Sequence, residues 1–338
     1  MNIIFSNYYK NKNMGNSISF LQEKRRNLPN IIYNDLTIEI DSIAAFDISV
    51  RRSNDEMNHM REFIIGAIYN SKVPAEYYIF SSRWKRLKEA TDKYLEKLLP
   101  DELINDVKCV HKGGRNSKYD FEITLNNKHT FNIEFKFNSS SQDSIPQFVS
   151  PMKPSQYLSN SYESHYYNNY LLPISKKFNM EIPSEDEYLQ KIHSPEPKCM
   201  KVFQEKYYKG CKNSSQYTGN NDDISFYNEL IKSSKESIQK FIEESDLNIE
   251  KMNEYLKKTQ EKKIYMMYKD NEFHFEESIP HQIESYTKTK TSYIAKTISN
   301  KKISILLRWK NGNGIAFPAF QISLQKEKKC LDLKKTQI

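Results

Sequence analysis

The sequence predicts an α/β fold in which a central mixed β-sheet is flanked by helices. The first observation is a strict alternation of apolar and polar residues from Tyr119 to Phe137, which is typical of two strands that each bury one face. The second is helical spacing of apolar residues, which predicts helices in three segments: 55–70, 75–98 and 222–262. The third is strand-like alternation in two later segments, 263–277 and 302–324.

These elements divide the chain into four regions: an N-terminal extension (1–54), a core (55–160), a mainly helical insertion (161–262), and C-terminal β-hairpins (263–338) that join or extend the core. Within the insertion, two helices broken near Ser245 fit the apolar stripe best. The hairpin that follows is expected to turn at Asp270-Asn271, because these residue types tolerate the positive φ angles of tight turns.

The first predicted hairpin is expected to turn at 126–128, where two asparagines again suit a tight turn. A loop of three residues would pair Leu125 with His129. The same register would place Asp120 directly opposite Glu134. Directly opposed side chains lie about 5 Å apart, and two carboxylates at that distance repel unless a cation lies between them.

Two more charged residues share this predicted strand face. Glu122 would lie diagonal to Glu134, and Lys136 would follow Glu134 two residues along the strand. The sequence therefore predicts a metal site, in which Glu122 is an additional candidate ligand, with a positive charge beside it.

Asp120, followed after thirteen residues by Glu134-Phe135-Lys136, resembles the D…(D/E)-x-K signature of the PD-(D/E)xK (restriction endonuclease-like) nucleases. The resemblance implies that Asp120 and Glu134 bind Mg²⁺ and that the carbonyl of Phe135 also coordinates it. Lys136 would orient or activate water. Tyr119 stands where the family name places a proline. Because half-exposed strands in a lysine-rich chain readily produce E-x-K, a polar hairpin without catalytic function is the alternative.

The resemblance also suggests supporting residues. Such nucleases often carry an acidic residue on the helix before the core sheet, and Glu62 or Glu56 would fill that role. Many carry a polar residue, often Gln, after the catalytic hairpin, and Gln147 or Gln156 would serve here. The alternative for each of these residues is an ordinary place on the surface.

Two groups of basic residues are candidates for DNA binding. The first lies in the loop around Gly113-Gly114 and consists of Lys112, Arg115 and Lys118. The second consists of Arg308 and Lys310, which flank Trp309 beside a glycine-rich turn, a grouping suited to a DNA backbone or base edge. The alternatives are a solvated loop for the first group and a hairpin with a buried Trp for the second.

The formal net charge of +8 favours an anionic partner, although lysine richness is also what an AT-rich genome would impose. The four cysteines are scattered without CxxC spacing, which favours free thiols in a reducing compartment. No apolar run approaches the roughly 18 residues of a membrane span, and the first residues lack the pattern of a signal peptide. The expectation is a soluble, intracellular protein with no membrane partner.

The first functional hypothesis is a Mg²⁺-dependent DNA endonuclease of restriction type, with Mn²⁺ as a substitute metal. Nucleases of this family commonly act as dimers, because cutting both strands of a duplex takes two sites, so the resemblance implies a homodimer. The second hypothesis is a nucleic-acid-binding protein without catalytic activity. The third is a structural protein of a virus or mobile element, in which the positive charge reflects genome composition.

Overall fold

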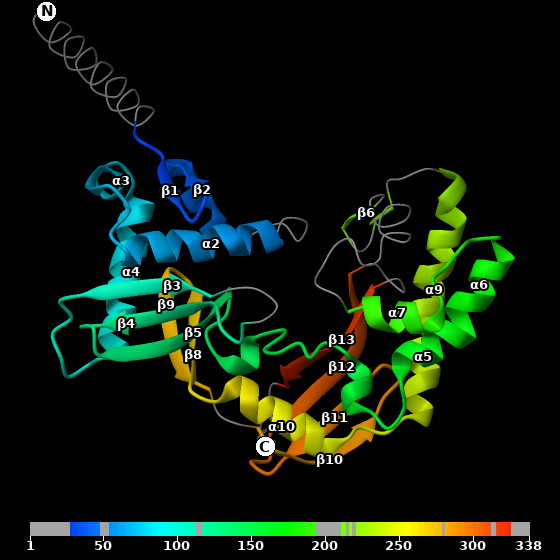
Figure 1. The fold of residues 1–338 in the computed structure, drawn as a ribbon. Coiled ribbons are helices and arrows are strands. Elements are labelled where there is room, and N and C mark those ends of the chain that lie inside the picture. Colours follow the sequence, from blue (N-terminus) through cyan, green and yellow to red (C-terminus); the bar gives the residue numbers. More distant parts are fainter. Residues whose placement is uncertain are drawn as a thin grey trace, which may run out of the picture. The chain divides into compact units, whose positions relative to one another are not determined.

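The computed structural model describes residues 28–47, 54–112, 117–193, 211–213, 216–217, 221–278, 281–311 and 316–325. The chain divides into two compact units (Figure 1). Unit 1 comprises the described residues up to Ser140 together with Lys262–Glu277. Unit 2 comprises Ser141–Glu261 and the described residues from Ser278 onward.

The sheet of unit 1 has five strands in the order β3-β4-β5-β8-β9. Their bounds are β3 (Val107–His111), β4 (Phe121–Leu125), β5 (His129–Phe137), β8 (Lys263–Lys269) and β9 (Glu272–Glu277). The first three form an antiparallel meander, β8 runs parallel to β5, and β9 is antiparallel to β8. The sheet is therefore mixed, as predicted, and the strands of 263–277 join it.

The turn between β4 and β5 confirms the predicted register. Asn126 and Asn127 adopt positive φ angles of 53° and 54°, and Leu125 pairs with His129. The turn between β8 and β9 has the same character, with φ of 53° at Asp270 and 64° at Asn271. Both turns use the residue types that reach this conformation at low cost, so local sequence fixes both hairpins.

Helices flank the sheet of unit 1, and its apolar core lies between them and the strands. These helices are α2 (Asn54–Tyr69), α3 (Ala75–Phe80) and α4 (Ser82–Leu98). The helix predicted over 75–98 is interrupted at Ser81, whose extended backbone separates α3 from α4 and whose hydroxyl accepts from the Trp84 amide. The contacts of α2 with β3 and of α4 with β9 set the two long helices on the sheet.

Part of the predicted N-terminal extension belongs to this core. Strands β1 (Ile31–Tyr33) and β2 (Leu36–Ile38) form a hairpin, and the 3₁₀ helix η1 (Ile40–Phe46) follows it. The buried Trp84 indole donates to the carbonyl of Ile40 at 2.7 Å. This segment is therefore tied to α4 by a buried hydrogen bond.

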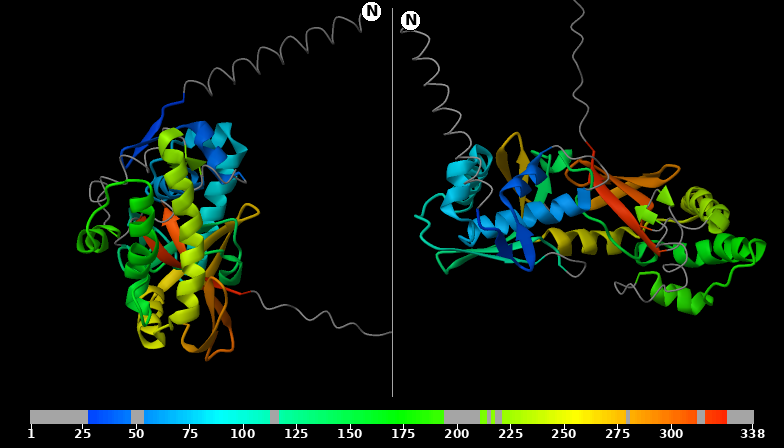
Figure 2. Two further views of the ribbon diagram at one scale, coloured as in Figure 1. Left: turned by 90° about the vertical axis from the view of Figure 1, so that its right-hand side faces the viewer. Right: turned by 90° about the horizontal axis from the view of Figure 1, so that it is seen from above.

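Unit 2 contains a four-stranded antiparallel sheet in the order β10-β11-β12-β13. Its strands are β10 (Ile283–Lys288), β11 (Ser292–Thr297), β12 (Lys302–Asn311) and β13 (Ala316–Leu324). Its longer helices are α9 (Asn221–Glu244) and α10 (Ile249–Gln260), separated at the break predicted near Ser245. Figure 2 shows α5 (Tyr162–Tyr166) and α6 (Leu172–Lys177) alongside α9.

Unit 2 also contains short helices and strands. They are η3 (Gln142–Ser144), η4 (Pro154–Tyr157), the π-helix η5 (Tyr167–Leu171), α7 (Glu185–Lys191), β6 (Cys211–Asn213) and β7 (Gln216–Tyr217). The boundaries between the two units fall after Ser140, Glu261 and Glu277. The predicted boundary at 262 agrees with the second of these to within one residue, whereas no boundary lies at 54 or 160. Of the described strands in 263–338, β8 and β9 join unit 1. Strands β10–β13 instead build a second sheet with its own helices.

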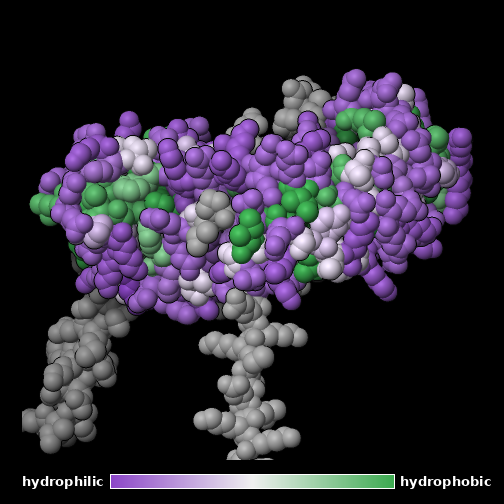
Figure 3. Space-filling view, turned by 90° about the horizontal axis from the view of Figure 1, so that it is seen from below, coloured by the Kyte–Doolittle hydropathy of each residue, from purple (hydrophilic) through white to green (hydrophobic). Residues whose placement is uncertain are grey.

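No helix in the described ranges is long and apolar enough to cross a membrane. Most residues on the face shown in Figure 3 are hydrophilic, and the hydrophobic patches on it are separate from one another.

Candidate active site

Asp120 immediately precedes β4, and the β4–β5 register brings it beside Glu134. Phe121 pairs with Ile133, so Asp120 and Glu134 form the next opposed positions. The Asp120 amide donates to the carbonyl of Ile133 at 2.9 Å. Its Oδ2 accepts from the Phe135 amide at 2.8 Å. Backbone and side chain of Asp120 are therefore both fixed against β5.

Glu134 is held by two lysines, one at each carboxylate oxygen. Lys136 Nζ lies 2.5 Å from Oε1, and Lys263 Nζ lies 3.1 Å from Oε2. The three side chains are largely buried, with 13% of Glu134, 24% of Lys136 and 5% of Lys263 exposed. Lys263 begins β8 and pairs with Asn132 in the parallel register, which sets it on the same face as Glu134.

The charges in this cluster shift one another's titration. Burial raises the pKa of the Asp120 carboxyl to about 7, and the Glu134 carboxylate is the second cause. Burial alone would raise the pKa of Glu134, but the positive charges of Lys136 and Lys263 outweigh it and hold that pKa below its usual range. Burial alone would lower the pKa of Lys136, but Glu134 and Asp120 together raise it.

Glu62 approaches the same cluster from α2. Its carboxylate adds to the raised pKa of Asp120 and also acts on Lys136, so it lies within electrostatic range of both. Glu62 Oε2 lies 2.9 Å from His111 Nε2, and 14% of each side chain is exposed. Of the two helix glutamates considered, Glu62 is therefore part of the cluster, whereas Glu56 is exposed to solvent.

Other predicted residues lie apart from these ionic contacts. Glu122 shares the strand face, but its carboxylate pairs with Lys112 at 3.5 Å and both side chains are partly exposed. Gln147 and Gln156 belong to unit 2, whereas the cluster is built from residues of unit 1. Lys118 is exposed. Arg115 lies outside the described residues.

Trp309 is buried in unit 2, which favours the predicted alternative of a hairpin with a buried Trp. Its indole donates to the Tyr162 hydroxyl at 2.9 Å and packs against the Tyr166 ring. Stacking of Trp309 on a base is therefore excluded in this conformation. Arg308 points the other way along the strand alternation, and its Nη1 donates to Gln321 Oε1 at 2.5 Å.

Sequence reasoning missed two members of the cluster, Lys263 and His111. Lys263 lies 129 residues from Glu134 in the chain, so no local pattern connects them. His111 ends the strand that leads to Asp120, and its ring stacks on Phe63 with centroids 5.0 Å apart. Its position at that strand end was the one available signal.

The donor set suits Mg²⁺. Asp120, Glu134 and the Phe135 carbonyl offer hard oxygen atoms, and a divalent cation would relieve the repulsion between the two carboxylates. Among the described residues, no three His, Cys, Asp or Glu side chains gather around one point. A Mg²⁺ ion held by Asp120 and Glu134 would take its remaining ligands from water and substrate.

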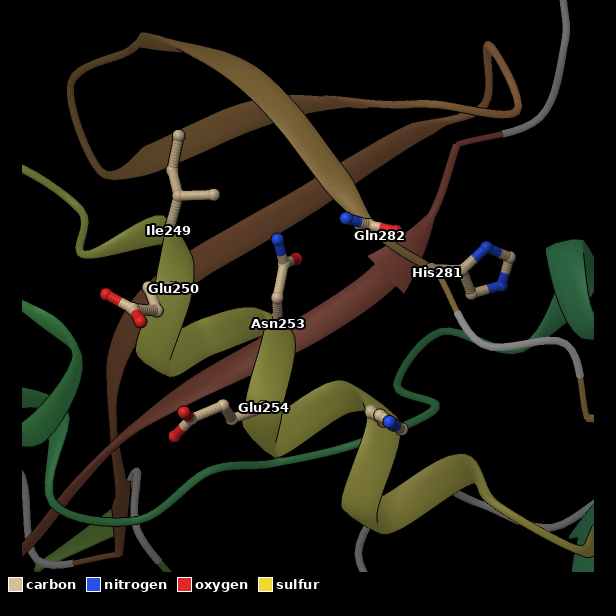
Figure 4. A pocket seen from close by; sticks show the side chains of 7 residues that line it. Ile249, Glu250, Asn253, Glu254, His281 and Gln282 are labelled. Atoms are coloured by element: carbon tan, nitrogen blue, oxygen red, sulfur yellow. The ribbon is translucent and has the colours of Figure 1, made fainter.

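A pocket of about 790 Å³ in unit 2 carries different chemistry (Figure 4). It is lined by α10 and the start of β10, including the exposed Glu250 and Glu254 and the buried His281. Burial and Lys301 lower the pKa of His281, and its ring packs edge-on against Phe148. The neutral imidazole therefore serves packing at one end of this pocket.

Comparisons of the chain with protein-family models, with curated proteins and with solved structures give no match.

Lys263 provides a first test of the cluster. Replacing it with methionine removes one of the two cations that neutralise a buried carboxylate, so the free energy of unfolding is expected to fall by about 2–3 kcal/mol. Lys269→Met, at the exposed end of the same strand, is the matched control and is expected to change stability by less than about 0.5 kcal/mol. Urea denaturation of both variants would measure this, and equal losses would contradict a specific role for Lys263.

Proposed function

We propose that unit 1 is the catalytic domain of a Mg²⁺-dependent DNA endonuclease. The observation that carries the proposal is the gathering of Asp120, Glu134 and Lys136, with Glu62 in electrostatic range, at one place on a mixed sheet. Strand β5, helix α2 and the residue immediately before β4 supply these groups. Two acids and a lysine are the groups that metal-dependent phosphodiester hydrolysis uses, because the acids offer oxygen ligands to Mg²⁺ and the lysine supplies a fixed positive charge.

Each residue of the chain has a chemical task in this proposal. Asp120 and Glu134 would hold Mg²⁺, which when bound polarises the phosphate and lowers the pKa of a water ligand. Lys136 keeps its proton because the surrounding carboxylates raise its pKa, so it acts as a fixed positive charge. It would orient the attacking water and stabilise the negative charge that develops on the phosphoryl oxygens.

The neighbouring groups would position these residues. Lys263 holds the second oxygen of Glu134, and the Phe135 amide holds Asp120. His111 holds Glu62. Supported orientation of this kind is what a catalytic constellation requires, since small displacements of reacting groups cost large factors in rate.

The architecture supports the same assignment. A mixed sheet with helices against it, and with the candidate site at the β4–β5 hairpin, agrees with the restriction endonuclease-like core that the D…E-x-K resemblance implies. Duplex DNA is the proposed substrate. A homodimer remains part of the proposal, because two sites are needed to cut both strands.

A nucleic-acid-binding protein without catalytic activity is the second candidate. It is favoured by the two lysines that occupy both oxygens of Glu134, since a buried Lys–Glu–Lys cluster is also a stable structural arrangement. The nuclease requires a divalent metal and Lys136 to cleave DNA, whereas the binding protein does not cleave DNA under any condition.

Cleavage of mixed plasmid and phage DNA in Mg²⁺, Mn²⁺ or EDTA tests the proposal. We expect metal-dependent fragments from the wild type and a loss of about 10²–10³-fold in rate for Lys136→Ala, because a charge that stabilises the transition state is removed. Lys128→Ala, in the exposed hairpin turn, should cleave at the wild-type rate. Folded wild-type protein that cuts none of these DNAs with either metal would favour the binding protein instead.

A further inference from the structure

The two faces of the β10–β13 sheet differ in composition. One face is apolar and buried, and it includes Tyr293, Ile305, Leu307, Trp309 and Phe320. Helices α5 and α9 pack on this side, where Tyr162 contacts both Trp309 and Phe241. Because this face is occupied by the core of unit 2, the side chains of the opposite face point away from that core.

The pairing registers identify the residues of the opposite face, here named the outer face. They are Ser285, Thr287, Ser292, Ile294, Lys296, Lys302, Ser304, Leu306, Arg308, Ala319, Gln321 and Ser323. This set contains three cations, five hydroxyl groups and no carboxylate; Ser292, whose hydroxyl bonds to Thr289, and Ala319 are buried. Glu284, in the β-bulge of the edge strand, lies 3.6 Å from Lys296 and offsets part of that charge.

One row of this face crosses all four strands. Thr287 pairs with Ile294, Ile294 with Ser304, and Ser304 with Ser323. Lys296 and Lys302 lie opposite each other on one side of the row and are exposed. Arg308 lies on the other side of it, two positions beyond Leu306.

Arg308 is oriented before any ligand binds. Its Nη1 donates to Gln321 Oε1 at 2.5 Å, and Gln321 Nε2 donates to the carbonyl of Pro146 at 3.0 Å. The guanidinium is therefore held by a side chain that is itself anchored to the backbone. A pre-oriented guanidinium loses less conformational entropy on binding an anion than a free one does.

We propose that the outer face of the β10–β13 sheet binds the phosphate backbone of duplex DNA. This inference rests on the proposed function and assigns substrate holding to unit 2. Arginine, lysine and hydroxyl side chains are the groups that contact DNA phosphates, and they position a duplex without reading its sequence. The occupant is a polyanion because the face carries positive charge and hydrogen-bond donors, and Ile294 and Leu306 are too few to form a hydrophobic protein interface.

Fluorescence anisotropy with a labelled 20-base-pair duplex tests this binding, in EDTA so that no cleavage occurs. The test variant carries Lys296→Gln, Lys302→Gln and Arg308→Gln. The matched control carries Lys232→Gln, Lys235→Gln and Lys258→Gln, which remove the same charge from exposed helix positions of unit 2. We expect the test variant to bind at least about 10-fold more weakly and to lower the slope of log K against log salt by about 2–3, because about 0.9 is lost per phosphate contact.

A second variant tests the outer face in case the triple variant does not fold. Ser323→Glu places a carboxylate on the outer face while keeping all three cations, and it is expected to weaken binding as well, with an unchanged circular dichroism spectrum. Equal affinities of test and control variants would overturn the proposal. So would tighter binding of single-stranded RNA of the same length, or no binding of the duplex by the wild type.

The outcomes separate this proposal from the nuclease itself. If binding depends on the outer face but the protein does not cleave DNA in Mg²⁺ or Mn²⁺, the proposed DNA-binding face is supported and the proposed nuclease activity is contradicted. If cleavage depends on Lys136 but both triple variants bind DNA equally well, the nuclease activity is supported and the proposed DNA-binding face is contradicted.

Discussion

Replacing Glu134 with glutamine is expected to abolish metal-dependent cleavage and to lower the free energy of unfolding by about 3–5 kcal/mol. The substitution keeps the shape of the side chain but removes the charge that neutralises Lys136 and Lys263. Two ammonium groups would then remain beside each other without the carboxylate that pairs them. Loss of one partner from a buried ion pair costs this much because the charge left behind is uncompensated.

The matched control is Glu122→Gln, on the same strand face of the same sheet. Glu122 pairs with Lys112 at 3.5 Å, and 30% and 38% of the two side chains are exposed. Solvent-exposed pairs contribute little, so a loss of less than about 1 kcal/mol is expected. Chemical denaturation measures both variants. Similar losses for Glu122→Gln and Glu134→Gln would mean that the buried cluster has no special contribution to stability.

The same cluster explains which parts of the site local sequence could predict. Asp120, Glu134 and Lys136 belong to one hairpin, and alternation together with an Asn-Asn turn is enough to set its register. Lys263 enters through the parallel pairing of β8 with β5, which joins segments far apart in the chain. Such pairing is decided by packing of the whole sheet, and a single sequence carries no local sign of it.

Trp309 shows a related limit. Alternation along β12 correctly divides Trp309 from Arg308, but it does not say which side faces a core and which faces solvent. Helices α5 and α9 decide this by supplying Tyr162 and Phe241 on one side. For the same reason alternation does not say which sheet a strand of 263–338 joins: β8 and β9 enter unit 1, whereas β10–β13 form the sheet of unit 2.

In metal-free buffer, Asp120→Asn is expected to be more stable than the wild type at high pH and to lose this advantage as the pH falls. The pKa of Asp120 is about 7 in the folded protein, against 3.8 for an unperturbed Asp. Between these two values the folded state holds a proton that the unfolded chain has released, so stability falls as the pH rises through this window. Above about pH 7 the wild type carries the full cost, on the order of 4 kcal/mol, whereas near pH 4 this cost is almost absent.

Asparagine avoids this cost because it is neutral at every pH, and its carbonyl can still accept from the Phe135 amide. Asp120→Asn should therefore be more stable than the wild type at pH 8 in EDTA and lose this advantage progressively as the pH falls toward 4. Thermal or urea denaturation across this range measures the difference between the two proteins, in which most other titrating groups cancel. A difference that does not vary with pH would contradict the raised pKa.

Mg²⁺ should reverse the order of the two proteins at pH 8. A cation between Asp120 and Glu134 turns their repulsion into attraction, so the wild type is expected to gain stability with increasing Mg²⁺ while Asp120→Asn gains little. The gain should shrink at pH 5, where the Asp120 proton competes with the metal. If Mg²⁺ stabilises both proteins equally, it binds elsewhere and the carboxylate pair is not the metal site. A gain confined to the wild type would assign the metal to this pair independently of any DNA cleavage.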